Sequence, residues 1–168
     1  MDQLLFARVN GWYPYAEFVW KTLADPRAAL VLVAYVVWAA YTTQRWLVVV
    51  AAALAVGATD PLCSMVLKPR FAVVRPCESL PRVYAPPNID GTASCGVGYA
   101  MPSNHAANTM ALATVLASPP LAGVSLVVGV SRVVTGQHWP SDVGAGWLIG
   151  AGVGGFVRLL LSRIKRWT

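Results

Sequence analysis

The sequence predicts an all-α protein: an integral membrane helical bundle of about five transmembrane helices with an additional N-terminal interfacial helix. Hydrophobic residues make up 57% of the chain and charged residues only 12%, whereas soluble domains carry roughly 25% charged residues. Long apolar runs alternate with short segments that hold most of the polar residues, proline and glycine. Because the length is that of one domain, we expect residues 1–168 to form a single membrane-embedded unit.

Residues 1–25 are predicted to form the interfacial helix. Apolar residues alternate there with the charged residues Arg8, Glu17 and Lys21. These charges favour an amphipathic helix that lies at the headgroups over one that spans the bilayer, although the sequence leaves both arrangements open. Arg8, Asn10 and Gly11 break the apolar stretch that a signal peptide needs.

Two spans are predicted next, followed by a long loop. Residues 28–41 contain no charge and reach spanning length if the flanking arginines extend to the headgroups. Residues 46–67 form the second span, interrupted by Asp60-Pro61. Residues 68–101 are polar and rich in proline and glycine. A loop of this length inside a compact domain is usually functional, so we expect it to border the active site.

Three further helices are predicted over residues 103–118, 121–136 and 141–164, with Pro119-Pro120 forming the turn between the first two. Many glycines in these helices indicate close helix packing. If neighbouring helices are antiparallel, the helix ends that carry polar residues emerge on one membrane face. These residues are Lys68, His105, His138 and Asp142.

The polar residues fall into three ordered motifs that together carry cations, a hydroxyl, two imidazoles and a carboxylate. Breaking a phosphate ester through a histidine nucleophile requires these groups. Both histidines of the chain lie inside the motifs. The motifs read Lys68-x6-Arg75-Pro76, Pro102-Ser103-Asn104-His105 and Ser131-Arg132-x5-His138-x3-Asp142.

The third motif offers the most specific chemistry. His138 and Asp142 are four residues apart, a spacing that lets the carboxylate accept from one ring nitrogen and leaves the other as nucleophile. Arg132 lies near the end of an apolar helix, where a charge is costly without a partner or a function. A phosphate clamp is one explanation, and a buried ion pair with Asp60 is the other.

The first two motifs have a structural and a functional interpretation. Ser103 is an ordinary residue for a helix N-cap, but a helix N-terminus also binds anions. His105 would then give a proton to the leaving oxygen. Lys68 and Arg75 are either cations that extend to the headgroups or cations that neutralise phosphoryl oxygens, and the other motifs favour the second interpretation.

The three motifs resemble those of the type 2 phosphatidic acid phosphatase superfamily, which includes bacterial lipid phosphate phosphatases and vanadium haloperoxidases. Two departures are Asn104, where glycine is usual, and Val73, where many relatives carry arginine. The resemblance implies a phosphatase domain in which His138 becomes a phosphohistidine, Asp142 orients it and His105 is the general acid. It implies no metal and no other cofactor. The implied phosphate-binding residues are Lys68, Arg75, Ser103 and Arg132.

The resemblance also implies the substrate class. We expect a metal-independent phosphatase for a membrane lipid phosphate, with polyprenyl (undecaprenyl) pyrophosphate favoured by family analogy. Lipid A 1-phosphate, phosphatidylglycerophosphate and phosphatidic acid remain open as substrates. A non-enzymatic membrane protein or transporter is the alternative from another class. The thirteen lysines and arginines are scattered rather than clustered, so we expect no nucleic-acid partner. The oligomeric state is not predicted.

In this family the site opens on the extracytoplasmic side, so we expect a multi-pass protein of the cell (inner or plasma) membrane whose site faces the periplasm or cell exterior. Cys77 and Cys95 share one polar loop, which allows a disulfide without requiring one. Residues of the same loop are expected to select the lipid headgroup. The candidates are Arg82, Tyr84 and Asn88.

Overall fold

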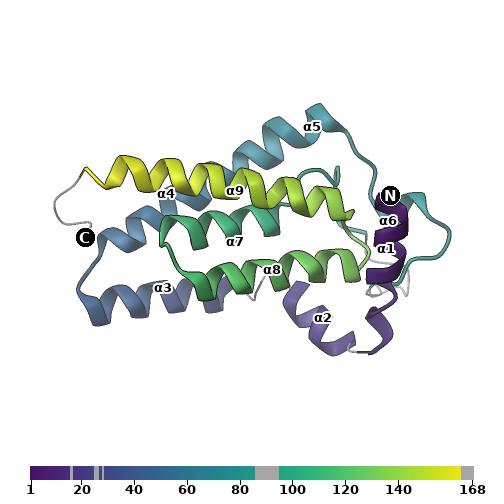
Figure 1. Cartoon of the computed structure of the whole chain (residues 1–168), viewed down its shortest axis with the longest axis horizontal. Helices are drawn as coiled ribbons and strands as arrows, with labels where there is room; N and C mark the ends of the chain where they lie inside the picture. The colour runs from purple at the N-terminus through teal and green to yellow at the C-terminus, as the bar shows by residue number, and fades with distance from the viewer. Residues whose placement is uncertain (16, 25–26, 28, 86–94, 164–168) are drawn as a thin grey trace.

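The computed structural model describes residues 1–15, 17–24, 27, 29–85 and 95–163, and within these ranges every regular element is a helix. The all-α prediction is therefore confirmed. The long helices run side by side along one axis, and the short ones gather near one end of the bundle (Figure 1). Predicted headgroup residue Asn88 lies outside the described residues.

The N-terminal segment forms two helices instead of the single one expected. Gly11 and Pro14 interrupt it, because neither residue favours a helix interior. The first helix packs against the ends of α8 and α9, and the second packs against α8. The elements are α1 (Asp2–Asn10), the 3-10 turn η1 (Tyr13–Tyr15) and α2 (Glu17–Ala24).

The second span is longer than predicted. Pro61 lies inside the helix, where its missing N–H removes a hydrogen bond. A π-helical segment, η3 (Leu62–Leu67), follows directly, and the chain continues helical to Phe71 before Ala72 takes a left-handed φ of 48°. The helices here are α3 (Ala29–Thr43), α4 (Leu47–Pro61), α5 (Lys68–Phe71) and, after the break, α6 (Pro76–Ser79).

The three later helices form as predicted, with one correction at Pro119-Pro120. These prolines begin a helix and do not form the turn, because proline is well suited to the first helical positions. The Ser118 hydroxyl accepts from the backbone N–H of Leu121 at 3.5 Å and caps that helix. The helices are α7 (Asn104–Val115), α8 (Pro119–Val134) and α9 (Pro140–Leu161).

Helix α7 is central and packs against α4, α8 and α9. Glycines of α9 allow its backbone to approach α7 closely: a Cβ at Gly146 would lie 2.6 Å from the carbonyl oxygen of Ser103, and one at Gly150 would lie 2.9 Å from the backbone nitrogen of Ala111. Such contacts are too short for any side chain. The predicted role in close helix packing is confirmed for Gly129, Gly146, Gly150 and Gly154. It is wrong for Gly123, Gly144 and Gly152, where a Cβ would meet nothing within 4 Å.

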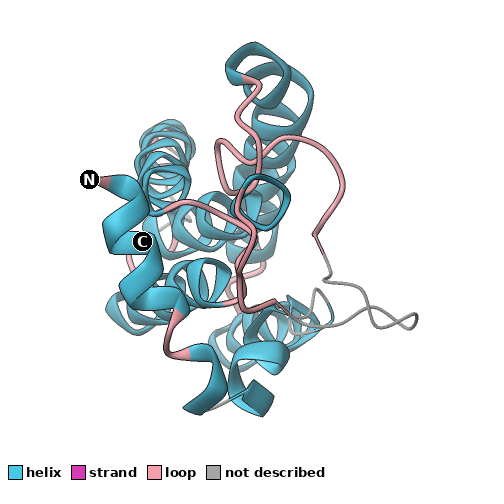
Figure 2. Ribbon diagram, turned by 90° about the vertical axis from the view of Figure 1, so that its right-hand side faces the viewer, coloured by secondary structure: helices cyan, strands magenta, loops and turns pink. Residues whose placement is uncertain are grey.

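Two helical stretches, Leu47–Ser79 and Pro140–Leu161, are long and apolar enough by length and composition to cross a membrane. Leu30–Thr43 and Pro119–Val134 are shorter apolar helices. Large apolar side chains such as Leu148 and Phe156 are exposed on the outside of the bundle. Figure 2, turned by 90°, views the end of the bundle where the connecting loops gather, and this end holds the polar motifs.

Candidate active site

One cavity of about 550 Å³ brings the three sequence motifs together. Its walls come from the end of the second long helix, the segment around residues 96–99, the start of α7 and the loop between α8 and α9. The predicted meeting of helix ends on one face is therefore found in the structure. The motif residues that line the cavity are Lys68, Arg75, Asn104, His105, Arg132 and His138.

His138 lies in the loop between α8 and α9 and is only 3% exposed. Its Nε2 is 3.4 Å from Nη1 of Arg75. Because a guanidinium only donates, this contact requires a lone pair on Nε2. Burial, followed by the charges of Arg75 and Arg132, holds the pKa of His138 well below its ordinary value of 6.5. The imidazole is therefore neutral, with Nε2 available as a nucleophile or base.

Asp142 approaches the other side of the same ring. Its Oδ2 lies 3.6 Å from Nδ1 of His138 and accepts a hydrogen bond of 2.7 Å from the backbone N–H of Trp139. The carboxylate is completely buried. It therefore caps the start of its own helix and faces Nδ1, although 3.6 Å is longer than a hydrogen bond. The predicted hydrogen bond between His138 and Asp142 is therefore not formed, and the two side chains instead lie in close contact.

Arg75 and Lys68 both hold the segment of residues 96–99, which lines the cavity. Arg75 is 5% exposed; its Nε donates to the carbonyl of Gly98 at 2.8 Å and its Nη1 to the carbonyl of Gln137 at 2.9 Å. The Nζ of Lys68 donates to the carbonyl of Tyr99 at 2.6 Å. These cations therefore position the backbone around His138 and also line the cavity.

Arg132 is buried at the end of α8, and its Nη2 donates to Oε1 of Gln137. Sequence reasoning missed Gln137 as a site residue. The available signal was a polar side chain directly before His138, within a short polar connection between two apolar helices. Gln137 uses its side chain on Arg132 and its backbone carbonyl on Arg75, so one residue joins two cations of the site.

Ser103 precedes α7 but does not cap it with its side chain, contrary to the ordinary expectation for this position. Its backbone N–H instead donates to the carbonyl of Asp142 at 3.0 Å, which joins the starts of α7 and α9. The side chain is completely buried, and within the described part of the chain its Oγ has no hydrogen-bond partner. The Ser103 side chain is not among those that line the cavity, although its neighbours Asn104 and His105 are.

Asp60 receives hydrogen bonds from α7. Its Oδ1 accepts from Nδ2 of Asn104 at 2.9 Å and from Nδ2 of Asn108 at 2.8 Å. The alternative predicted from the sequence was that Asp60 forms an ion pair with Arg132. In the structure, the two amides supply the hydrogen bonds that a carboxylate inside an apolar helix needs. They also explain why asparagine is compatible with the position before His105.

The N-terminal helix braces the same loop, which the sequence did not predict. Both side-chain oxygens of Asp2 bind Ser141: Oδ1 accepts from its N–H at 3.1 Å and Oδ2 from its hydroxyl at 2.6 Å. The ring of Phe6, 2% exposed, lies 5.2 Å from that of Trp139. Helix α1 therefore contacts the residues on both sides of Pro140, directly beside His138 and Asp142.

The predicted headgroup residues Arg82 and Tyr84 are not brought to this cavity. They line a separate pocket of about 570 Å³ beside α1. Asn10 holds Tyr84 there: its Nδ2 donates to the carbonyl of Tyr84 at 2.7 Å, and its Oδ1 accepts from the N–H of Tyr84 at 2.9 Å. The ring of Tyr84 also stacks on Tyr13.

A disulfide joins Cys77 of α6 to Cys95. The backbone N–H of Cys77 also donates to the carbonyl of Gly136 at 3.2 Å. The disulfide therefore fixes the segment after Cys95 to α6. The hydrogen bond of Cys77 in turn fixes α6 to the loop before His138. In the described ranges, no group of three or more His, Cys, Asp or Glu side chains is arranged to hold a metal ion.

The fold is similar to those of two solved structures. The crystal structure of Aquifex aeolicus LpxE matches with a TM-score of 0.69 at 21% identity, over 95% of this chain and 94% of that one. A transmembrane PAP2 type phosphatidylglycerolphosphate phosphatase from Bacillus subtilis matches with a TM-score of 0.53 at 20% identity, over 99% of this chain and 97% of that one. At these identities the likeness concerns the fold alone.

A curated relative, an undecaprenyl-diphosphatase of Sulfolobus acidocaldarius, is 43% identical over 60 residues. The match covers 32% of this chain and 29% of the relative, so the chain spans less than a third of that protein's length. A family model described as the PAP2 superfamily matches residues 45–166. Because that match covers more than half of the chain and contains all three motifs, the protein belongs to the PAP2 superfamily.

Proposed function

We propose that the protein is a membrane lipid phosphatase that acts without a metal through a phosphohistidine on His138. The observation that carries this proposal is the convergence of all three family motifs on one cavity around a neutral, buried imidazole. Membership of the PAP2 superfamily supports the same reaction class. Lys68, Arg75 and Arg132 give the cavity the positive charge that a phosphate requires.

In the first step, Nε2 of His138 bonds to phosphorus while the bond from phosphorus to the leaving oxygen breaks. His105 gives its proton to that oxygen. The Lys68 ammonium, the two guanidiniums and the Ser103 hydroxyl bind the phosphoryl oxygens. Asp142 stabilises the positive charge that develops on the His138 ring.

In the second step, water attacks the phosphohistidine. His105, which lost a proton in the first step, accepts one from this water as the bond from phosphorus to Nε2 of His138 breaks. Inorganic phosphate leaves and the site returns to its starting protonation state. Both transfers are in line, so the same cations stabilise the charge of each transition state.

The proposed substrate is undecaprenyl pyrophosphate or a related polyprenyl pyrophosphate. The supporting observation is the partial match to a protein named undecaprenyl-diphosphatase. Phosphatidylglycerophosphate is the second candidate, because a structural neighbour is named as a phosphatase for that lipid. Lipid A 1-phosphate and phosphatidic acid complete the set of substrates to compare.

We place the protein as multi-pass in the cell membrane, with its cavity open to the periplasm or cell exterior. Four apolar helical stretches support several membrane crossings. The Cys77–Cys95 disulfide beside the cavity supports an outward-facing site, because such bonds persist in oxidising compartments and are rare in the cytosol.

The test is phosphate release by the purified protein from each of these four lipids in detergent micelles. We expect the polyprenyl pyrophosphate to give the highest kcat/KM. His138→Ala is expected to remove both turnover and the acid-labile phosphoenzyme trapped from ³²P-labelled substrate. A protein that releases no phosphate from any lipid would falsify the enzyme assignment, and a His138→Ala variant that is still phosphorylated would contradict the choice of nucleophile.

A further inference from the structure

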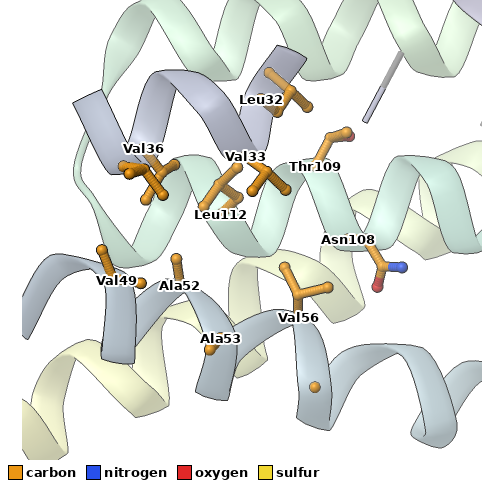
Figure 3. Close-up of a pocket in the computed structure, with 12 residues that line it drawn as sticks. Leu32, Val33, Val36, Val49, Ala52, Ala53, Val56, Asn108, Thr109 and Leu112 are labelled. Atoms are coloured by element: carbon orange, nitrogen blue, oxygen red, sulfur yellow. The ribbon is translucent and has the colours of Figure 1, made fainter. Parts of the chain in front are cut away.

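The catalytic cavity differs from the cavity between α3, α4 and α7 in the groups that it offers to a ligand. The latter, about 360 Å³ in volume, is lined by apolar side chains apart from Asn108 and Thr109 (Figure 3). Within the described ranges, no charged side chain lines it. An anion therefore belongs in the catalytic cavity. Besides its cations, this cavity contains neutral polar side chains, among them Ser64, Asn104 and Gln137.

Ser64 and Asn104 already use their donors on one residue, Asp60. The hydroxyl of Ser64 donates to the backbone carbonyl of Asp60 at 2.8 Å. Nδ2 of Asn104 donates to the carboxylate of Asp60 at 2.9 Å. Gln137 is bound differently, because its side chain contacts a cation of the site.

Arg132 determines which end of the Gln137 amide is left for a ligand. Nη2 of Arg132 donates to Oε1 of Gln137, and a guanidinium has only donors, so the amide must present its oxygen to it. Within the described part of the chain, Nε2 of Gln137 donates to no protein group, and it is not one of the fully buried polar atoms. Because Gln137 lines the cavity, its NH2 group is open to a ligand there.

The backbone of Gln137 is also held in place, directly beside the nucleophile. Its N–H donates to the carbonyl of Arg132 at 3.1 Å, and its carbonyl accepts from Nη1 of Arg75 at 2.9 Å. The same Nη1 lies 3.4 Å from Nε2 of His138. The amide is therefore fixed before a ligand arrives, so little side-chain entropy is lost when it binds one.

We propose that Nε2 of Gln137 donates a hydrogen bond to a phosphoryl oxygen of the bound substrate. This inference rests on the proposed function, because it takes the catalytic cavity as the place of the phosphate. Lys68, Arg75 and Arg132 supply the positive charge of the site. Gln137 adds a neutral donor of fixed direction next to His138, which holds the phosphoryl group against the nucleophile.

Two substitutions separate this role from a role in holding Arg132 alone. Gln137→Glu keeps an oxygen for Arg132 but replaces the NH2 donor with a carboxylate oxygen, which repels phosphate. Gln137→Met keeps the length of the side chain and removes both the acceptor and the donor. Gln3 is exposed on α1 and does not line the cavity, so Gln3→Glu and Gln3→Met are the matched controls.

The first readout is the Kd of inorganic phosphate, measured by isothermal titration calorimetry in detergent micelles. We expect Gln137→Met to weaken binding about tenfold, because one hydrogen bond to a charged group is lost. Gln137→Glu should weaken it about a hundredfold through the added repulsion, and the Gln3 variants should leave it unchanged. If Gln137 only held Arg132, Gln137→Glu would bind phosphate better than Gln137→Met. That order of affinities, or equal affinities of these two variants, overturns the proposal.

The second readout uses the wild-type protein and requires no turnover. The chain has three glutamines, Gln3, Gln44 and Gln137, so ¹⁵N-glutamine labelling gives three side-chain NH2 signals in NMR spectra, and Gln137→Met identifies one of them. We expect saturating phosphate to shift a Gln137 amide proton downfield and to slow its exchange with solvent, while the Gln3 and Gln44 signals stay unchanged.

The two proposals fail in different ways. An unchanged Gln137 signal in a protein that hydrolyses a lipid phosphate overturns the role of Gln137, and the proposed function stands. If the Gln137 signal responds as expected but no lipid phosphate is hydrolysed, the proposed function fails, and Gln137 remains a phosphate-binding residue.

Discussion

At the scale of single residues, the proposed chemistry depends on keeping His138 neutral. The ring is 3% exposed and faces the guanidinium of Arg75 on one side and the Asp142 carboxylate on the other. Protonation would place a second cation against the guanidinium of Arg75, which is also buried. Burial and the nearby cations outweigh the single carboxylate, and the pKa of His138 falls.

This environment predicts the titration of His138. Because its pKa lies well below 6.5 in the folded protein, the ring should remain neutral as the pH falls through 6.5. The unfolded chain takes up this proton first, so His138 lowers the free energy of unfolding as the pH falls below about 6.5. Histidine-selective ¹³C labelling with NMR detection measures the midpoint, and His138→Gln identifies its resonance. A midpoint at or above 6.5 would contradict the neutral nucleophile.

Asn104 illustrates how a departure from the family pattern finds a local explanation. Glycine is usual at this position in the family that the motifs resemble, and the sequence alone identified no partner for the asparagine. In the structure the Asn104 amide donates to Asp60. A carboxylate inside an apolar helix is costly without such donors. Asn104 therefore stabilises the buried side chain of Asp60.

At the scale of elements, α1 acts as a brace for the loop that carries His138. Asn10 is 4% exposed and binds two remote segments: its Nδ2 donates to the carbonyls of Tyr84 and Val134, each at 2.7 Å, and its Oδ1 accepts from Tyr84. Val134 is the last residue of α8, four positions before His138.

We therefore predict that Asn10→Ala destabilises the protein by about 1–3 kcal/mol, because it leaves buried backbone groups without partners. The measurement is thermal unfolding in detergent. Arg8→Ala is the matched control on the exposed side of the same helix and should change the free energy of unfolding by less than about 0.5 kcal/mol. Equal effects of the two substitutions would show that α1 does not brace the loop.

The contact between α7 and α9 depends on glycine in a comparable way. A Cβ at Gly150 would lie 2.9 Å from the backbone nitrogen of Ala111, whereas one at Gly152 meets nothing within 4 Å. Gly150→Ala should therefore force the two backbones apart and destabilise the protein by roughly 1–3 kcal/mol. Gly152→Ala should stabilise it by up to about 1 kcal/mol through helix propensity alone. Thermal unfolding of both variants gives the comparison, and a neutral Gly150→Ala would contradict the close packing.

At the scale of the whole molecule, the sequence predicted the features that follow from local rules. Apolar runs predicted the helices, and the three spaced motifs at helix ends predicted the residues that line the cavity around His138. The errors arise where distant segments decide the outcome. Arg82 and Tyr84 share a loop with site residues, yet contacts with α1 draw them into another pocket. The motifs did not identify Gln137, because its role depends on a hydrogen bond with Arg75, which is 62 residues away in the sequence.

The proposed orientation of the whole molecule predicts its thiol content. If the cavity faces the periplasm or cell exterior, the Cys77–Cys95 bond forms in the cell and only Cys63 remains as a thiol. Freshly prepared membranes are denatured in the presence of a maleimide polymer that labels free thiols. The protein should then carry one adduct per chain, and three after reduction of the disulfide. The Cys63→Ser variant is the control and should give none before reduction. Three adducts in unreduced wild-type protein would place the cavity in a reducing compartment and contradict the orientation.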